Sequence, residues 1–191
     1  MPVFLGLYPQ LALDLQLDDR FVDVVAEGFD CAIRIAGHLP DSGLVAQALA
    51  KVPQVLVASP AYLDVAPPLR VPGDLPHHAC MAHVQSGLPL EWPAVAPGQL
   101  PVPVTAHYRV NNSVMLRDAL LAGQGVALTP YFVVADLLDN GQLQEVLPEH
   151  RLPDLTVFGV VPQARYLPRK VQAFMDFMAR ELADSGRMHE S

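Results

Sequence analysis

Three consecutive polar residues, Asn111, Asn112 and Ser113, are the part of this sequence best suited to bind a ligand. They follow a short predicted strand and precede a predicted helix, which Gly123 closes. The first N–H groups of a helix have no partner within it, and the helix dipole makes that end positive. Such a helix start binds carboxylates and similar anions. We therefore expect a pocket for a small anionic ligand here; the local alternative is that one of the three side chains caps the helix.

Three residues of neighbouring strands are candidates for the same pocket. Pro130 and Tyr131 follow the end of the next apolar strand, so we expect them at the same edge of a sheet, where ligands of α/β proteins bind. Tyr131 either stacks on an aromatic ligand or packs against the core. His83 ends a short predicted strand and either lines the pocket or forms hydrogen bonds within the protein.

Arg34 is the candidate from the first part of the chain. It lies on a predicted strand from Cys31 to Ile35, where a buried charge needs a partner. Its bidentate geometry suits a carboxylate ligand. The structural alternative is a salt bridge to Asp30 or Asp41.

Motifs for catalysis or metal binding are missing from the sequence. There is no serine hydrolase elbow, no zinc protease helix and no phosphate-binding loop. His77 and His78 are adjacent and point apart, and Cys31 and Cys80 show no metal-ligand spacing. We predict no catalytic residue, no metal and no cofactor, and two reduced thiols rather than a disulfide.

Composition and charge limit the class of protein further. With 51% hydrophobic residues and 17% charged residues in 191, the chain can bury a core. The net charge is −8 and the twelve lysines and arginines are scattered, which argues against a nucleic-acid surface. Met1 to Leu17 contains no export signal, and no window has the roughly 18 apolar residues of a membrane span. The prediction is a soluble, cytoplasmic protein without membrane contact.

Strands and helices alternate along the chain, which is typical of an α/β fold. Leucines at every second position from Leu11 to Leu17 predict a half-buried strand, and residues 22–27 predict a short helix. The helix after Ser113 is expected to bury Met115 and Ala122 along with its leucines. The other predicted elements are strands at 31–35, 44–50, 55–59, 79–83, 143–147 and 155–161, and helices at 60–63, at 131–139 and from 168 onward.

Several segments in this order resemble the effector-binding domain of LysR-type transcriptional regulators. The resemblance extends over nearly the whole chain, and the order of the segments makes it specific. The matching segments are Phe4-Leu5-x-x-Tyr8-Pro9, Asp19-Arg20-x-Val22-Asp23-x-Val25-x-Glu27-Gly28-Phe29-Asp30-x-Ala32-Ile33-Arg34, Ser59-Pro60-Ala61-Tyr62-Leu63, Val110-Asn111-Asn112-Ser113 and Ala122-Gly123-Gln124-Gly125-Val126-Ala127-Leu128-x-Pro130.

The resemblance implies a type II periplasmic-binding-protein-like fold, in which crossover strands join two α/β lobes with a ligand cleft between them. The expected crossovers are residues 55–59 and 155–161. Lobe one then comprises residues 1–59 and 156–191, and lobe two comprises residues 60–155. The family's domain opens with a strand that the sequence does not show, so lobe one is expected to lack its first strand. Both lobes together form one effector-binding domain.

The resemblance also implies a sensing and oligomerising role rather than catalysis. We expect a small, anionic organic effector, a homodimer or higher homo-oligomer, and DNA contact only through a winged helix-turn-helix that is absent from this chain. The residues expected at the effector are Arg34, His83, Asn111, Asn112, Ser113, Pro130 and Tyr131. Two alternatives stay open: a free-standing solute-binding protein, which needs an export signal, and a related enzyme such as a prephenate dehydratase-like protein, which turns over a bound acid.

Overall fold

The structure is a computed structural model that describes residues 1–18, 22–39, 43–83, 91–92, 102–150, 152–162 and 167–187. The chain divides by its internal contacts into two units. Unit 1 comprises Met1–Val52 with Leu155–Ser191, and unit 2 comprises Pro53–Asp154. Within the described ranges, none of the helices has the length and apolar character that a membrane crossing requires.

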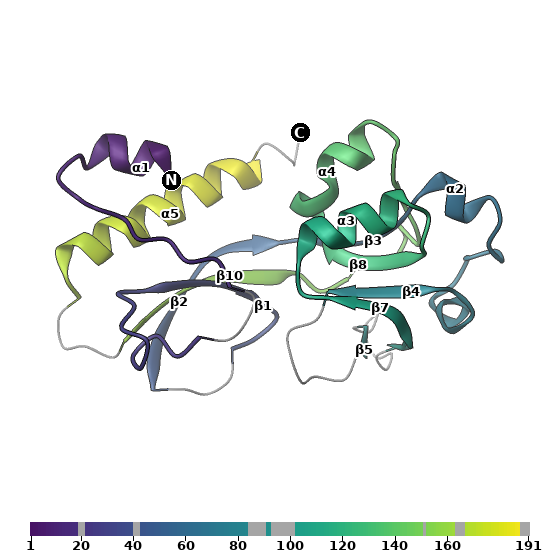
Figure 1. The fold of residues 1–191 in the computed structure, drawn as a ribbon, viewed down its shortest axis with the longest axis horizontal. Coiled ribbons are helices and arrows are strands. Elements are labelled where there is room, and N and C mark those ends of the chain that lie inside the picture. The colour runs from purple at the N-terminus through teal and green to yellow at the C-terminus, as the bar shows by residue number, and fades with distance from the viewer. Residues whose placement is uncertain are drawn as a thin grey trace. The chain divides into compact units, whose positions relative to one another are not determined.

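Unit 1 contains a three-stranded antiparallel sheet, with its central strand contributed by the C-terminal part of the chain (Figure 1). In spatial order its strands are β1 (Ala32–Ala36), β10 (Leu155–Pro162) and β2 (Leu44–Val52). Helix α5 (Arg169–Arg187) packs on this sheet. A Cβ at Gly159 would lie 1.8 Å from Cε of Met175, so the small residue lets the helix approach the central strand.

Helix α1 (Pro2–Leu7) packs against α5 through an aromatic cluster (Figure 1). The ring of Phe4 lies 5.3 Å from that of Phe174 and 5.2 Å from that of Phe177, measured between centroids. Phe4 is buried, although the rest of its short helix is largely exposed. The cluster therefore holds α1 in place, because six residues are too few for a stable isolated helix.

Two predicted elements of unit 1 are wrong. Leu11 to Leu17 is not a strand: its first two leucines pack beside the aromatic cluster, and its last two are exposed. Alternation predicts which side chains are buried, but a strand also needs a neighbour to receive its hydrogen bonds. The helix predicted at 22–27 is absent: residues 24–28 form turns, and the Asp23 carboxylate accepts bonds of 3.0 Å from the N–H groups of Val25 and Ala26.

Unit 2 contains a mixed five-stranded sheet (Figure 1). In spatial order the strands are β7 (Ala106–Val110), β4 (Cys80–His83), β8 (Val126–Pro130), β3 (Gln54–Ala58) and β9 (Gln144–Glu145). β4 runs parallel to both β7 and β8, whereas β3 is antiparallel to β8 and β9. The strand predicted at 143–147 is confirmed only as the two-residue β9.

The remaining elements of unit 2 are short, apart from two helices of nine residues each. They are α2 (Pro60–Leu63), the 3-10 helix η1 (Pro72–His77), β5 (Glu91–Trp92), β6 (Val102–Pro103), α3 (Ser113–Leu121) and α4 (Tyr131–Asp139). α4 has the predicted bounds, and Gly123 after α3 has the expected left-handed φ of +69°. The predicted burial of Met115 and Ala122 is wrong, because Leu116 and Leu120 mark the buried side of α3.

Both faces of the unit 2 sheet are buried, which explains its nearly continuous apolar strands. Val55 and Val57 of β3 lie in a core with residues of α3 and α4. Leu56 and Ala58, which point the other way, lie in a second core with Trp92 and other residues of the opposite face. α3 and α4 thus cover the same face of the sheet (Figure 1).

The chain passes from unit 1 to unit 2 after Val52 and returns after Asp154. β3 pairs with β8 and β9, so residues 53–59, which we expected in lobe one, are grouped with unit 2. The second expected crossover forms β10 at the centre of the unit 1 sheet.

Gly125 lets the chain that enters β8 pass close to Ala79. Its φ is +146°, and a Cβ would lie 2.0 Å from the carbonyl oxygen of Ala79. The N–H of Val126 donates to that same oxygen at 2.8 Å. A residue with a side chain would therefore be strained and would also push β8 away from β4.

We predict that Gly125→Ala lowers the free energy of unfolding by about 2 kcal/mol or more, through backbone strain and overpacking. Gly73→Ala is the matched control, because Gly73 lies in η1 of the same unit and a Cβ there would meet no atom within 4 Å. It should change stability by less than about 0.5 kcal/mol. Urea denaturation measures both values, and equal stability of the two variants would contradict the prediction.

Candidate functional site

Three parallel strands of unit 2 end at the same edge of the sheet, which we call the carboxyl edge. His83, the last residue of β4, is level with Val110, the last residue of β7. Ala82 is level with Leu128, so β8 ends here as well. The structure therefore brings six of the seven predicted residues to one edge. They are His83, Asn111, Asn112, Ser113, Pro130 and Tyr131.

The start of α3 is capped by its own N-cap residue. Oδ1 of Asn112 accepts hydrogen bonds from the N–H groups of Val114 at 3.0 Å and Met115 at 3.2 Å. The expectation that these donors are bare is therefore wrong, and the capping alternative is confirmed for Asn112. Asn111 is exposed and Ser113 is half-buried.

The start of α4 differs from that of α3 in having no capping side chain. Its N-cap is Pro130, and no side chain caps this end of the helix. The N–H of Tyr131 donates to the carbonyl oxygen of Pro53 at 2.9 Å. The next two N–H groups, of Phe132 and Val133, lie in the first turn, where a helix has no internal acceptor for them. The sequence signal for an uncapped helix start was available here: Pro130 stands at the N-cap position, where Ser, Thr, Asp or Asn would supply a capping side chain.

His83 lies between the two helix starts. It is half-buried, and its Nε2 is buried without a hydrogen-bond partner in the described part of the chain. A buried polar atom left unpaired costs free energy, and a ligand atom could satisfy it. Tyr131 is half-buried and packs against the core under α3 and α4, as the structural alternative predicted.

Arg34 belongs to unit 1, whereas the carboxyl edge belongs to unit 2. It lies in β1, half-buried, and its guanidinium donates to the carbonyl oxygen of Val22. Asp30, one carboxylate considered as its partner, forms an ion pair of 2.7 Å with Lys170. Asp41, the other, lies outside the described residues. Ligand binding by Arg34 stays a prediction.

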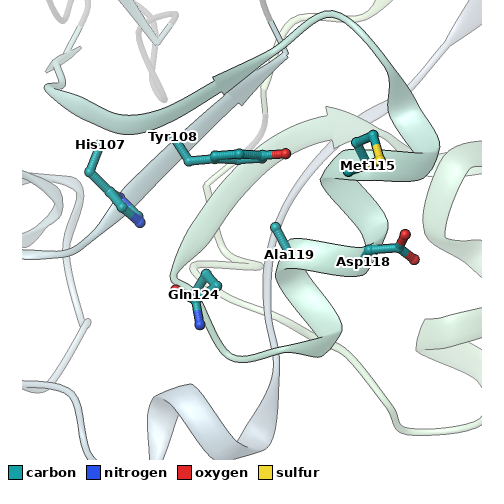
Figure 2. Close-up of a pocket in the computed structure, with 6 residues that line it drawn as sticks. All are labelled: His107, Tyr108, Met115, Asp118, Ala119 and Gln124. Carbon is teal, nitrogen blue, oxygen red and sulfur yellow. The ribbon is translucent and has the colours of Figure 1, made fainter.

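A separate groove lies between β7 and α3, with a volume of about 320 Å³. It is lined by His107, Tyr108, Met115, Asp118, Ala119 and Gln124, none of which the sequence predicted as a site. Nδ1 of His107 donates to the carbonyl oxygen of Cys80 at 3.0 Å, which leaves Nε2 as an acceptor in the neutral ring. Figure 2 shows the carboxylate of Asp118 pointing away from Tyr108 and Gln124. The groove therefore brings no acid and base together.

The two cysteines are poor nucleophiles and do not pair. Both are free thiols, with Cys80 buried and Cys31 half-buried. Burial raises the pKa of Cys80 to about 11, and burial followed by the charge of Asp30 raises the pKa of Cys31. A thiol with a raised pKa stays protonated at neutral pH. Within the described ranges, no three His, Cys, Asp or Glu residues come together as a metal site.

Comparison of the sequence with known proteins identifies related transcription factors. A family model described as the LysR substrate binding domain matches residues 1–183. YhjC of Escherichia coli K12, an uncharacterized HTH-type transcriptional regulator, is 38% identical over 179 residues, which cover 92% of this chain and 60% of that protein. The HTH-type transcriptional regulator PtxR of Pseudomonas aeruginosa is 33% identical over 180 residues, with 94% and 57% covered. The chain thus spans less than two thirds of the length of these relatives.

Solved structures of similar fold include regulatory domains of transcriptional regulators. The regulatory domain of CrgA, a LysR-type transcriptional regulator from Neisseria meningitidis, matches with a TM-score of 0.80 and 26% identity, covering 95% of this chain and 89% of that one. The effector domain of AmpR from Pseudomonas aeruginosa matches with a TM-score of 0.76 and 24% identity, covering 100% and 90%. These neighbours have the type II periplasmic-binding-protein-like fold, which confirms the predicted fold class.

We predict that Asn112→Ala lowers the free energy of unfolding by about 1 kcal/mol, because two N–H groups of α3 lose their cap. Asn111→Ala removes the same side chain from the exposed neighbouring position and should change stability by less than about 0.5 kcal/mol. Thermal or urea unfolding of both variants tests this difference. Two equal losses would show that the cap does not stabilise α3.

Proposed function

The chain belongs to the LysR substrate-binding domain family, and on that premise we propose that it is the effector-sensing part of a LysR-type transcriptional regulator whose effector binds the carboxyl edge. We further propose that the effector is a small organic anion. The observation that carries this proposal is the start of α4, which has no side-chain cap, together with Nε2 of His83 at the end of the paired strand β4, which is buried without a hydrogen-bond partner in the described part of the chain.

A carboxylate is complementary to these groups. It accepts hydrogen bonds only, and the N–H groups of Phe132 and Val133, which no side chain of the described residues caps, are donors at the positive end of a helix dipole. His83 adds a third donor when Nε2 carries the proton. Phe132 is 54% exposed, so an apolar body of the ligand could pack on its ring. Each contact between an anion and a helix start contributes about 0.3–1 kcal/mol to the free energy of binding, so several must act together to hold a ligand.

Sensing requires that the effector bind two arrangements of the domain with different affinity, since equal affinity shifts no equilibrium. We propose that this difference is passed to a DNA-binding part outside this chain. We also propose that the domain acts as a homodimer or higher homo-oligomer in the cytoplasm. The relatives are transcriptional regulators, which supports sensing rather than catalysis.

We predict that at least one small carboxylate stabilises the chain more than its uncharged amide does. The test compares acetate, benzoate and succinate with acetamide, benzamide and succinamide, each at 10 mM, in a thermal-shift assay. A dissociation constant of about 1 mM gives about 1.4 kcal/mol of stabilisation, or a rise in Tm of about 3–5 °C. If no acid exceeded its amide, the anion proposal would be wrong.

A charge placed at the start of α4 locates the binding site. Phe132→Glu puts a carboxylate beside these N–H groups and should weaken acid binding at least fivefold more than Phe132→Gln, which also removes the ring but adds no charge. Phe132 is largely exposed, so neither variant removes a core residue. Equal affinity of the two variants would place the anion elsewhere.

We propose Arg34 separately, within unit 1, as a residue that binds a carboxylate, so Arg34→Ala should weaken carboxylate binding about tenfold, because a hydrogen bond to a charged group contributes about 1.5–3 kcal/mol. Arg180→Ala is the matched control, since it removes an exposed positive charge from α5 of the same unit. Isothermal titration measures both affinities, and circular dichroism checks the fold. Unchanged affinity in Arg34→Ala would leave Arg34 as a structural cation that ties β1 to Val22.

A further inference from the structure

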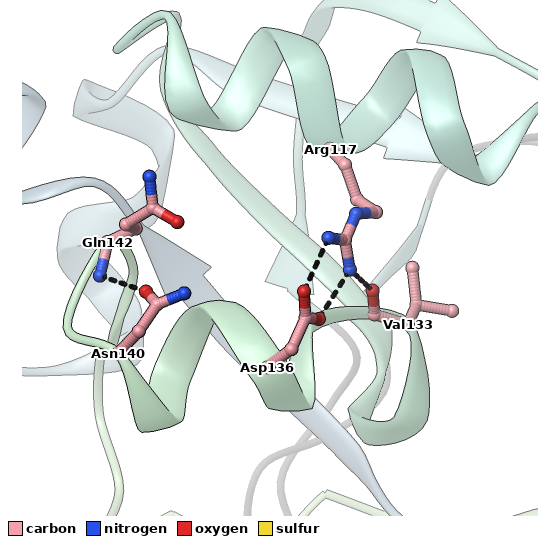
Figure 3. A network of polar contacts seen from close by, with 5 residues as sticks. All are labelled: Arg117, Val133, Asp136, Asn140 and Gln142. Atoms are coloured by element: carbon pink, nitrogen blue, oxygen red, sulfur yellow. Dashed lines mark hydrogen bonds and ion pairs between the residues drawn. The ribbon is translucent and has the colours of Figure 1, made fainter.

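Arg117 of α3 contacts α4 at two points (Figure 3). Its Nη1 and Nη2 donate to the two carboxylate oxygens of Asp136 at 2.7 and 2.8 Å. Nη1 also donates to the carbonyl oxygen of Val133, in the first turn of α4. The hydrogen bond with Asp136 is the main cause that raises the pKa of Arg117, and the same bond lowers the pKa of Asp136. The pair is therefore ionised at neutral pH.

The first turn of α4 depends on such outside contacts. α3 is fixed at its start by its own Asn112 cap, but α4 begins at Pro130 without a side-chain cap. At the opposite end of α4, Oδ1 of Asn140 accepts a bond of 3.0 Å from the N–H of Gln142 and closes the turn (Figure 3). Arg117 thus contacts the helix at the end that has no cap.

Exposure limits what this pair contributes to global stability. The side chains of Arg117 and Asp136 are 27% and 64% exposed, and ion pairs in contact with solvent typically add little to stability. The planar guanidinium, however, fixes the geometry of both groups that it contacts. A binding site must hold its donors to within about 0.5 Å, so a contact that adds little stability can still control affinity.

We propose that Arg117 is a positioning residue: it holds the first turn of α4 against α3 and thereby sets the affinity of the carboxyl edge for its effector. This inference rests on the proposed function, because the same helix start supplies the donors for the anion. Asp136 orients the guanidinium, and the carbonyl oxygen of Val133 accepts a hydrogen bond from it. Arg117 does not touch the effector.

The chain offers a matched control in unit 1. Lys170 and Asp30 form an ion pair of 2.7 Å with side-chain exposures of 52% and 58%, so Lys170 is more exposed than Arg117 at 27%. Lys170→Met should therefore cost no more stability than Arg117→Met and should not affect α4. Arg117→Lys keeps the charge and loses the two-pronged geometry, so it separates charge from positioning.

The experiment measures hydrogen–deuterium exchange and benzoate affinity in the same chains. Arg117→Met should speed amide exchange in Tyr131–Asp139 about fivefold, as expected for a local loss of about 1 kcal/mol, and should weaken benzoate binding to a similar extent. Arg117→Lys should fall between wild type and Arg117→Met. The Tm should fall by less than about 4 °C in both Met variants, and Lys170→Met should match wild type in exchange of α4 and in affinity.

Unchanged exchange in Tyr131–Asp139 would overturn the proposal, as would faster exchange with benzoate affinity within twofold of wild type. An equal loss of affinity in Lys170→Met would overturn it too, since any lost ion pair would then have the same effect. If the wild-type chain bound none of the test acids, the proposed function would fail and the affinity claim with it. The exchange result would in that case still report whether Arg117 holds α4.

Discussion

The parallel pairing of β4 with both β7 and β8 is the constraint on which the candidate site depends. Strands that run in one direction end at one edge, so the helices that follow β7 and β8 must both begin there. Because both faces of the sheet are buried, a shift of one residue in register would exchange the side chains of two separate cores. Gly125 secures that register by letting β8 begin against Ala79.

Much of this edge was predictable from the sequence, because its signals are local. An apolar strand followed by polar residues and an apolar helix predicts a strand end and a helix start, and α4 has the predicted bounds. The donors, however, were assigned to the wrong helix. Asn112 is both a polar residue that could contact a ligand and a preferred N-cap, and in the structure it caps α3. Pro130 cannot cap in this way, so α4 is the helix whose first turn has no side-chain cap.

Features that depend on partners far away in the sequence were not predictable. The leucines from 11 to 17 alternate like a strand, but alternation does not specify which strand would pair with them. Arg117 and Asp136 are 19 positions apart on two helices, and no periodic pattern links them. Likewise, Met115 fitted an apolar stripe by type, yet it lines the groove beside β7 because only one side of α3 faces the sheet.

Amide chemical shifts during a titration with benzoate test most directly whether the effector binds at the start of α4. We expect the largest changes at Phe132, Val133 and His83, and much smaller ones with benzamide. Changes centred on Val114 and Met115 would contradict this site, because those N–H groups are already bonded to Asn112. Changes confined to the groove between β7 and α3 would contradict it as well, and would place the ligand site there instead.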